Sequence, residues 1–396
     1  MDHAEDLNLK LHSLVIFRNL LADDVLCRLP AVLSMGSKNL VERIAGYSGF
    51  VSRLFQENEN LTDYIWGKIS SDQNVYVMKS ARKEAPGPVL EQCLVNDLKI
   101  LEEISQLTGS EMKKAISYEG YLPEWKNRPA DFIGDYESML LHVSTLGYGM
   151  FSRYHMFSIR NAEITPVTSP DPVRLSDLFG YDRERKSIID NTKALLNGKP
   201  AANTLLYGDA GTGKSSTVKA VANEYSSLGL RLIEIRKNQL LEIPAVVESL
   251  YQNPLKFILF IDDLSFAQNH EEIGVLKAIL EGTVCARANN VVIYATSNRR
   301  HLISEKFSDR SNDEIHANET IQEQVSLSDR FGLSVKFIKP DKEQFLSIVY
   351  ELASQYGIAD THDLELRAEK YAIERGGRSP RIARQFAEYL KRIEKC

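Results

Sequence analysis

Residues 208–215 have the composition of a phosphate-binding loop. They read Gly-Asp-Ala-Gly-Thr-Gly-Lys-Ser, between a strand-like and a helix-like segment. Glycines permit a tight turn whose backbone N–H groups approach phosphate oxygens, and the following helix directs the positive end of its dipole at the same anion. Lys214 can reach the β- and γ-phosphates, and the Ser215 hydroxyl can ligate Mg²⁺. An ordinary glycine-rich turn is the alternative, but the flanking segments favour a nucleotide site.

Two acidic residues form a second candidate element. Asp262 and Asp263 come directly after the apolar segment 257–261. Ligands of open parallel sheets lie beyond the carboxyl ends of the strands, so these carboxylates are expected near the phosphate loop. Asp262 can hold Mg²⁺ opposite Ser215, and Asp263 can orient or deprotonate an attacking water. The alternative is a pair that caps the next helix.

One amide and two arginines complete the set of candidate residues. Asn298, which follows segment 291–295, can hydrogen-bond the γ-phosphate or the water, although turn residues of this type are common. Arg330 can act as an arginine finger on another subunit's γ-phosphate, or it only pairs with Asp329 at the surface. Arg381 falls in the first turn of an expected helix, where it can cover phosphates, with a solvated basic face as the alternative.

The elements that must position these residues alternate between helices and strands. From residue 175 onward, helical stretches separate five β-rich segments, which are 203–207, 230–235, 257–261, 291–295 and 333–337. This alternation predicts a parallel sheet with helices on both faces. After residue 340 the pattern predicts a small bundle of three helices, at about 341–356, 361–375 and 379–394.

The same pattern divides the chain into parts. We expect a mainly helical N-terminal domain, a proline-rich linker, an α/β nucleotide-binding domain and a helical lid, at residues 1–164, 165–174, 175–340 and 341–396. The linker contains three prolines, which exclude a helix interior or a central strand. The aromatic stretch 147–157 can stack nucleobases, but a packed hinge between domains is the favoured interpretation.

Composition places the chain among ordinary globular proteins. Of its 396 residues 43% are hydrophobic and 26% charged, with a net charge of −6, so no global basic field attracts nucleic acid or anionic membrane. The four cysteines lie far apart without a metal-site spacing, which favours free thiols in a reducing compartment. No apolar run approaches the ~20 residues that span a bilayer. A cytoplasmic protein with no membrane partner is expected.

In this order, the candidate elements resemble those of the AAA+ ATPases: Walker A, Walker B, sensor 1, arginine finger and a helical lid with sensor 2. The resemblance covers about residues 175–396. Four phrases, at 205–216, 262–266, 294–302 and 326–332, closely resemble the bacterial AAA+ family called domain of unknown function 815. Likeness at 178–183 and 147–151 extends it toward the N-terminal half.

The resemblance implies ATP and Mg²⁺ as ligands and assigns roles by position. Gly180 and Tyr181 would border the adenine pocket, Asp262 and Ser215 would bind Mg²⁺, and Arg381 would be sensor 2. Asn298 would be sensor 1 and Arg330 the finger. The residues of the loop expected to contact nucleotide are Gly208, Asp209, Ala210, Gly211, Thr212, Gly213, Lys214, Ser215 and Ser216.

Two departures from the wider AAA+ pattern bear on function. Walker B usually ends in Asp-Glu, whereas this chain has Asp262-Asp263, and the shorter second acid predicts slow hydrolysis. Protein-threading rings carry an aromatic residue after the second strand, whereas residues 236–241 have none. Threading is therefore not expected, and the segment is more similar, by analogy, to initiator and helicase-loader ATPases.

The leading hypothesis is an ATPase whose site lies between subunits of a homo-oligomer. It would load, remodel or regulate an unidentified protein partner or DNA-associated assembly that the N-terminal domain recognises. The main alternative is a nucleotide-gated binding module with negligible hydrolysis. A P-loop kinase would have no need of Arg330 and Arg381, and an ABC-type ATPase would carry a Leu-Ser-Gly-Gly signature, which the sequence lacks.

Overall fold

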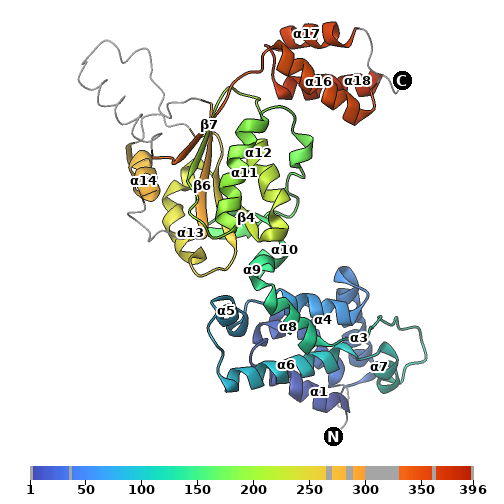
Figure 1. Ribbon diagram of the computed structural model, residues 1–396. Coiled ribbons are helices and arrows are strands. Elements are labelled where there is room, and N and C mark those ends of the chain that lie inside the picture. The colour runs from blue at the N-terminus through green and yellow to red at the C-terminus, as the bar shows by residue number, and fades with distance from the viewer. Residues whose placement is uncertain are drawn as a thin grey trace. The chain divides into compact units, whose positions relative to one another are not determined.

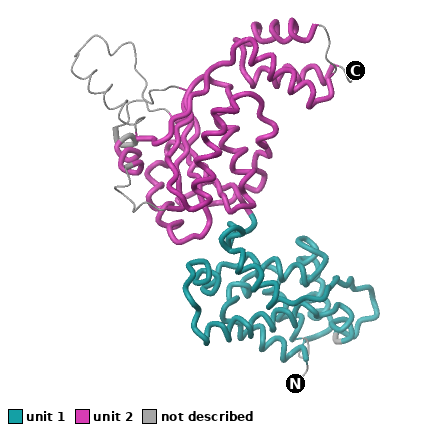
Figure 2. Tube along the Cα trace, viewed as in Figure 1, with its two compact units in different colours: residues 1–153 teal, residues 154–396 magenta. Residues whose placement is uncertain are grey.

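The computed structural model describes residues 3–34, 38–264, 270–281, 289–298, 330–358 and 363–393. They form two compact units, unit 1 at residues 1–153 and unit 2 at residues 154–396 (Figure 2). The division falls inside the aromatic stretch 147–157, earlier than the expected boundary at residue 164. Residues 156–166 explain the difference, because they pair into the sheet of unit 2.

Unit 1 is helical, as the apolar spacing predicts. Local polar residues begin several of its helices: Asn39 and Thr108 each form a capping box with a glutamate three residues later. The elements are α1 (His3–His12), η1 (Arg18–Ala22), η2 (Leu26–Arg28), α2 (Leu29–Leu33), α3 (Leu40–Glu57), α4 (Leu61–Ser70), α5 (Val75–Ala81), α6 (Pro88–Ser105), α7 (Gly109–Ile116), α8 (Phe132–Leu141), α9 (Val143–Leu146) and α10 (Met150–Arg153).

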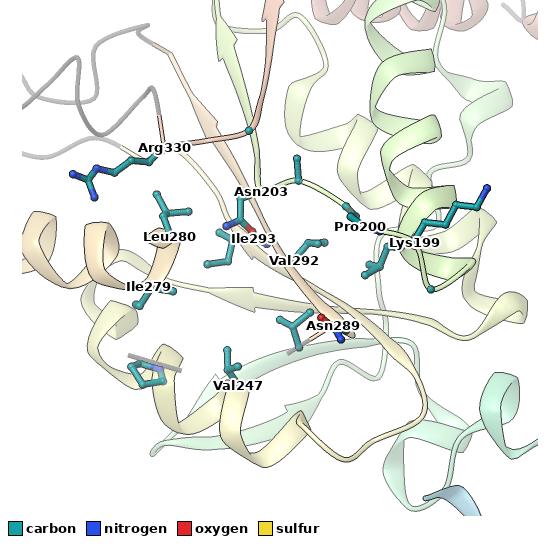
Figure 3. A pocket seen from close by; sticks show the side chains of 17 residues that line it. Lys199, Pro200, Asn203, Val247, Ile279, Leu280, Asn289, Val292, Ile293 and Arg330 are labelled. Carbon is teal, nitrogen blue, oxygen red and sulfur yellow. Dashed lines mark hydrogen bonds between the residues drawn. The ribbon is translucent and has the colours of Figure 1, made fainter. Parts of the chain in front are cut away.

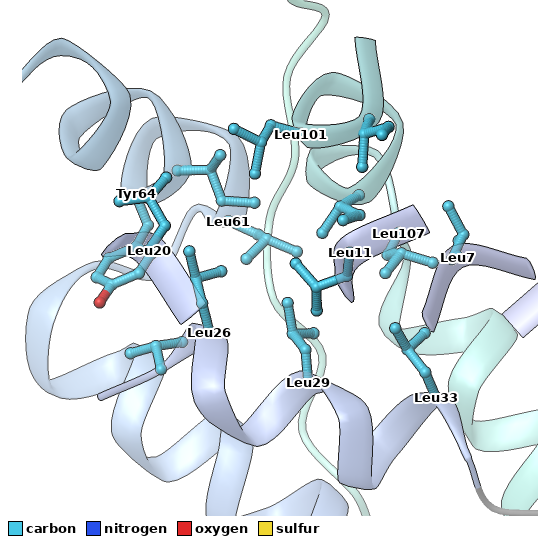
Figure 4. Packing of buried hydrophobic residues seen from close by; sticks show 14 of the residues in the cluster. Leu7, Leu11, Leu20, Leu26, Leu29, Leu33, Leu61, Tyr64, Leu101 and Leu107 are labelled. Carbon is cyan, nitrogen blue, oxygen red and sulfur yellow. The ribbon is translucent and has the colours of Figure 1, made fainter. Parts of the chain in front are cut away.

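Leucine side chains from α1, α2, α4 and α6 meet in the core of unit 1 (Figure 4). One carboxylate is buried with them. Asp97 of α6 is fully buried, and its Oδ2 accepts hydrogen bonds from the backbone N–H groups of Val15, Ile16 and Phe17 at 2.8, 2.7 and 3.2 Å. Asp97 therefore fastens the segment after α1 to α6, because a buried turn must satisfy its N–H groups internally.

Unit 2 is built on a twisted sheet whose described part has seven strands. Its order is β2-β1-β4-β5-β6-β3-β7, and every neighbouring pair is parallel except β1 and β2. The strands are β1 (Met156–Arg160), β2 (Glu163–Pro166), β3 (Thr204–Gly208), β4 (Leu230–Ile235), β5 (Lys256–Ile261), β6 (Val291–Ser297) and β7 (Leu333–Phe337). The five predicted strands are thus confirmed, and β1 and β2 are additions.

Helices cover both faces of this sheet, α11 and α12 on one side and α13 and α14 on the other (Figure 1). The bundle α16–α18 follows β7. This is the predicted AAA+ architecture, an α/β domain with a C-terminal helical lid. The elements are η3 (Leu175–Asp177), α11 (Asp182–Leu196), α12 (Lys214–Glu224), η4 (Ser226–Leu228), η5 (Lys237–Glu242), α13 (Ile243–Leu250), α14 (His270–Glu281), α16 (Lys342–Tyr356), α17 (Leu364–Glu374) and α18 (Pro380–Ile393). No helix in the described ranges is long and apolar enough to cross a membrane.

The proline-rich segment predicted as a linker belongs to unit 2. Its first residues end the outermost strand β2, where Pro166 is tolerated because an edge strand has one unpaired side. Residues 167–174, called the strap below, then lead to η3 without forming a helix or a strand. Val167 donates its N–H to the carbonyl of Met156 at 2.9 Å, which ties the start of the strap to β1.

Candidate nucleotide-binding site

The phosphate loop joins β3 to α12, with Gly208 ending the strand and Lys214 starting the helix. Gly208, Gly211 and Gly213 have φ angles of +132°, +78° and +89°, a region that side chains disfavour. A Cβ on Gly208 would lie 1.9 Å from the carbonyl oxygen of Phe337 in β7. Only glycine fits there, so this glycine serves the close approach of two strands.

The next residue fastens the loop to the end of β7. Asp209 donates its N–H to the Phe337 carbonyl at 2.8 Å, and its Oδ2 accepts the N–H of Lys339 at 2.7 Å. Gly208 and Asp209 therefore hold the loop in place, whereas Ala210 to Ser216 line the adjoining cavity. The sequence assigned all of these residues to nucleotide contact.

A cavity of about 500 Å³ lies at the carboxyl edge of the sheet. Besides the loop, it is bounded by the strap, the start of α11, the ends of β5 and β6, and the lid. These walls contribute Asp171, Val173, Asp177, Leu178, Phe179, Arg185, Thr217, Asp262, Asp263, Thr296, Asn298, Ile348, Leu352, Pro380, Arg381 and Arg384.

Oxygen atoms from three elements converge beside the phosphate loop. The Ser215 hydroxyl donates to Asp262 Oδ1 at 2.6 Å, and the Thr296 hydroxyl donates to the same atom at 2.5 Å. A hydroxyl beside a carboxylate is a donor set suited to Mg²⁺, which takes oxygen ligands and binds with substrate phosphates. The two residues predicted to ligate Mg²⁺ are thus in direct contact.

Lys214 and the two remaining polar candidates form a chain of hydrogen bonds. The Lys214 ammonium donates to the carbonyls of Gly208 and Asp209 at 3.0 and 2.7 Å and to Asn298 Oδ1 at 3.1 Å. Asn298 Nδ2 in turn donates to Asp263 Oδ1 at 3.0 Å. Burial lowers the pKa of Lys214, because desolvation disfavours its charged form. The negative charge of a phosphate ligand would favour the charged form of Lys214 and raise its pKa again.

The lid reaches the loop through Arg381. Its backbone N–H donates to the Gly211 carbonyl at 3.2 Å, and the residue lines the cavity. Arg384, one turn later, also lines the cavity and donates to the Asp177 carbonyl at 2.6 Å. Arg378 instead forms a two-point pair with Glu369 at 2.9 and 2.6 Å. Arg381 and Arg384 therefore face the candidate site, and Arg378 stabilises the lid.

Apolar residues form the part of the wall suited to a base. They come from the segment before α11 and from α16, and are Val173, Leu178, Phe179, Ile348 and Leu352. The sequence placed this border at Gly180 and Tyr181. Tyr181 instead is buried in the core and donates its hydroxyl to the Ile338 carbonyl at 2.6 Å. The border is shifted toward Leu178 and Phe179, because Tyr181 turns inward to anchor the segment after β7.

Arg330 lies apart from this cavity. It precedes β7 and, with Asn203 and the start of β6, lines a second cavity of about 530 Å³ at the amino edge of the sheet. Its side chain extends away from the other labelled residues of that cavity (Figure 3). Because β3 runs between the two edges, Arg330 and the phosphate loop of one chain are separated by about five residues of strand, roughly 16 Å.

Thr296, Arg384 and Arg185 are among the cavity residues that were not predicted as site residues. Thr296 holds Asp262, Arg384 contacts the segment before α11, and Arg185 is a buried arginine in the first turn of α11. Thr296 was detectable, since it lies at the end of β6, at the same sheet edge as Asn298. Arg384 was detectable too, since it lies one turn after Arg381 on the same face of α18. Arg185 enters the site through tertiary packing, which spacing along the chain does not encode.

The residues present fit ATP with Mg²⁺. Positive φ angles at Gly211 and Gly213 shape a loop with room for an anion, and a Cβ on Gly213 would meet no atom within 4 Å. Ser215 and Asp262 offer adjoining oxygen ligands, and Lys214 offers a cation.

Comparison with known proteins identifies the family to which this chain belongs. The model of a family described as protein of unknown function (DUF815) matches residues 152–393. The replication factor C large subunit of Staphylothermus marinus is 33% identical over 119 residues, 28% of this chain and 27% of that protein. The corresponding subunit of Thermofilum pendens is 28% identical over 116 residues, 28% of each chain. The chain thus matches little more than a quarter of the length of these curated relatives.

Among solved structures, the Thermotoga maritima RuvB Holliday junction branch migration motor aligns with a TM-score of 0.38 and 18% identity. The alignment covers 57% of this chain and 67% of that one.

Proposed function

This chain belongs to the DUF815 family of AAA+ P-loop proteins, and from that premise we propose that it binds ATP and hydrolyses it with Mg²⁺ between two subunits. The cycle would load, remodel or regulate a partner macromolecule. The contact between Ser215 and Asp262, 2.6 Å apart at the ends of two different elements, is the observation that carries the proposal. This arrangement places two possible oxygen ligands of a cation beside a buried lysine, which a purely structural turn does not require.

In the proposed reaction, the oxygen of a water molecule bonds to the γ-phosphorus while the bond between that phosphorus and the bridging oxygen of ADP breaks. One proton of the water stays on the released phosphate, and the other leaves to solvent. Lys214 exchanges its loop-carbonyl partners for phosphate oxygens, and Asp263 orients the water through its carboxylate. Asn298 hydrogen-bonds both side chains and so holds the Lys214 ammonium and the Asp263 carboxylate in a fixed arrangement. Mg²⁺, held by Ser215 and Asp262, would neutralise charge on the phosphates when bound.

The position of Arg330 supports a site shared between subunits. Within one chain it lies at the amino edge of the sheet, opposite the phosphate loop, so it cannot serve its own nucleotide. In a homo-oligomer it would reach the γ-phosphate of a neighbour. Such fingers raise turnover by roughly 10³–10⁵-fold where they act.

Mixing two inactive variants tests the proposal. Lys214→Ala removes the phosphate lysine but keeps Arg330, and Arg330→Ala keeps the phosphate site but removes the finger. Each alone is expected to hydrolyse ATP at least ~10²-fold more slowly than the wild type. An equimolar mixture should regain activity, because a Lys214→Ala subunit can donate its arginine to an Arg330→Ala neighbour.

The outcomes separate the parts of the proposal. No regained activity in the mixture contradicts the shared site. Arg330→Ala turnover equal to wild type at every protein concentration removes Arg330 from the mechanism. Failure of wild-type protein to bind ATP by calorimetry overturns the nucleotide assignment itself.

A binding module with negligible hydrolysis is the second candidate function, and the backbone of Asp263 favours it. This residue has φ of +52°, and its carboxylate is engaged by Asn298. A non-glycine residue in the left-handed region is conformationally strained, and aspartate reaches one methylene less far than glutamate. Single-turnover phosphate release distinguishes the two: release within one binding cycle supports the ATPase.

The proposal about the partner rests on the sequence matches of 119 and 116 residues to curated relatives. Two relatives are named as replication factor C large subunits, which favours a DNA-associated protein assembly over a metabolic substrate. DNA affinity that falls steeply with salt would support direct contact with phosphates, and absent affinity would point to a protein partner alone.

A further inference from the structure

One buried amide links the strap to the phosphate-loop helix. Asn223 lies in the last turn of α12, the helix that begins with Lys214. Its Nδ2 donates to the carbonyls of Asp171 and Val173 in the strap, at 2.8 and 2.7 Å. Asp171 and Val173 both line the nucleotide cavity.

A histidine completes the hydrogen bonds of this amide. His155 Nε2 lies 2.9 Å from Asn223 Oδ1. Because both strap atoms are carbonyl oxygens, they require the NH₂ group of Asn223, and Oδ1 must face His155. His155 Nε2 therefore carries the hydrogen. All of the amide's bonds are directional and short, so its orientation is fixed.

We propose that Asn223 is a positioning residue for nucleotide binding, which clamps the strap to α12 so that the base-side wall of the cavity keeps its place relative to the phosphate loop. The inference rests on the proposed nucleotide site and concerns its base side. Pro170 and Pro172 lack backbone donors, and the N–H of Val173 is engaged within the strap, by Asp171 Oδ1 at 3.2 Å. The middle of the strap is therefore held to α12 through the carbonyl oxygens of Asp171 and Val173.

The structure supplies a matched control elsewhere in unit 2. Asn290, just before β6, is buried like Asn223, and its Nδ2 donates to the carbonyls of Leu250 and Asn253 at 2.8 and 2.9 Å. It holds the loop between α13 and β5, at the amino edge of the sheet. Asn290→Asp removes the same two donors as Asn223→Asp without touching the cavity.

Calorimetric titration with two ligands tests the clamp. Inorganic tripolyphosphate with Mg²⁺ needs only the phosphate loop, whereas ATP also needs the base wall. Asn223→Asp should weaken ATP about tenfold, the effect of losing two hydrogen bonds, and leave tripolyphosphate within twofold of wild type. Asn290→Asp should leave both ligands unchanged. Equal ATP affinity in the two variants, or an equal loss for both ligands in Asn223→Asp, overturns the clamp.

A measurement on the wild-type chain covers the case in which Asn223→Asp does not fold. ATP should slow amide hydrogen exchange at Asp171 and Val173, and tripolyphosphate should not. Unchanged exchange with saturating ATP overturns the inference. If neither ligand binds the wild-type protein, the proposed nucleotide site fails instead, so the two failures are distinguishable.

Discussion

Units 1 and 2 use aspartates in opposite ways. Asp97 in unit 1 is sealed in the core and accepts three backbone N–H groups from one segment. Asp262 in unit 2 is half-buried beside a cavity and accepts the hydroxyls of Ser215 and Thr296. Backbone donors cannot leave without unfolding the turn, whereas hydroxyls can rotate toward another ligand. The first arrangement stabilises a fold, and the second leaves exchangeable ligands for a cation.

The largest expected effect is on Asp262. Asp262→Asn keeps an acceptor for both hydroxyls, so the thermal midpoint measured by circular dichroism should change little. It removes the charge that would face Mg²⁺, and ATP turnover should fall by about 10²–10³-fold. Turnover within threefold of wild type would mean that Asp262, like Asp97, only supports the fold.

The next largest effect is on Asp97. Asp97→Asn places an NH₂ group where Oδ1 is buried without a partner among the described residues, which should cost about 1–3 kcal/mol of stability. The chain's two tryptophans, Trp66 and Trp125, both lie in unit 1, so urea unfolding followed by tryptophan fluorescence reports that unit.

The control for Asp97→Asn is Glu103→Gln on the same helix, whose carboxylate pairs with Lys10 at the surface. It should leave the urea midpoint unchanged. ATP turnover should be unaffected by either substitution, and a turnover loss specific to Asp97→Asn would contradict the contrast between the two carboxylates.

The smallest effect is a pH dependence that only the cavity should show. Burial lowers the pKa of Lys214, and bound phosphates would raise it, so the complex takes up a proton between the two pKa values. ATP affinity should therefore fall as pH rises through that interval, by at most about tenfold per pH unit. Calorimetry in buffers of different ionisation enthalpy measures the uptake. Adenosine, which has no phosphates, should show none.

The sequence predicted that the polar residues of the candidate site lie at one edge of the sheet, because the strand pattern determines where they lie. Each of Lys214, Asp262 and Asn298 follows a strand of a parallel sheet, and parallel strands end at one edge. Strand periodicity alone therefore brings these side chains together. The lid arginine Arg381 was found through the start signals of its helix.

The parts that were not predicted depend on pairing over distance. Strands β1 and β2 are joined by Asn161 and Ala162, both at positive φ, a two-residue hairpin turn whose sequence is not a strong turn signal. Proline residues in 165–174 predicted a linker, but an edge strand followed by an irregular segment that lines the cavity accommodates them equally. Tyr181 looked like a ligand contact and is a core residue.

The attachment of the lid has a mechanical consequence. Its root, at Lys339, is bonded to Asp209, and its tip returns to Gly211 through the N–H of Arg381. Both attachments of the bundle, at Asp209 and at Gly211, therefore lie on the same short loop. Helix α16 alone has 15 residues and is about 22 Å long, so a rotation of about 5° about the attachment at Lys339 moves its far end by about 2 Å. A ligand that displaces this loop would therefore act on both attachments of the lid.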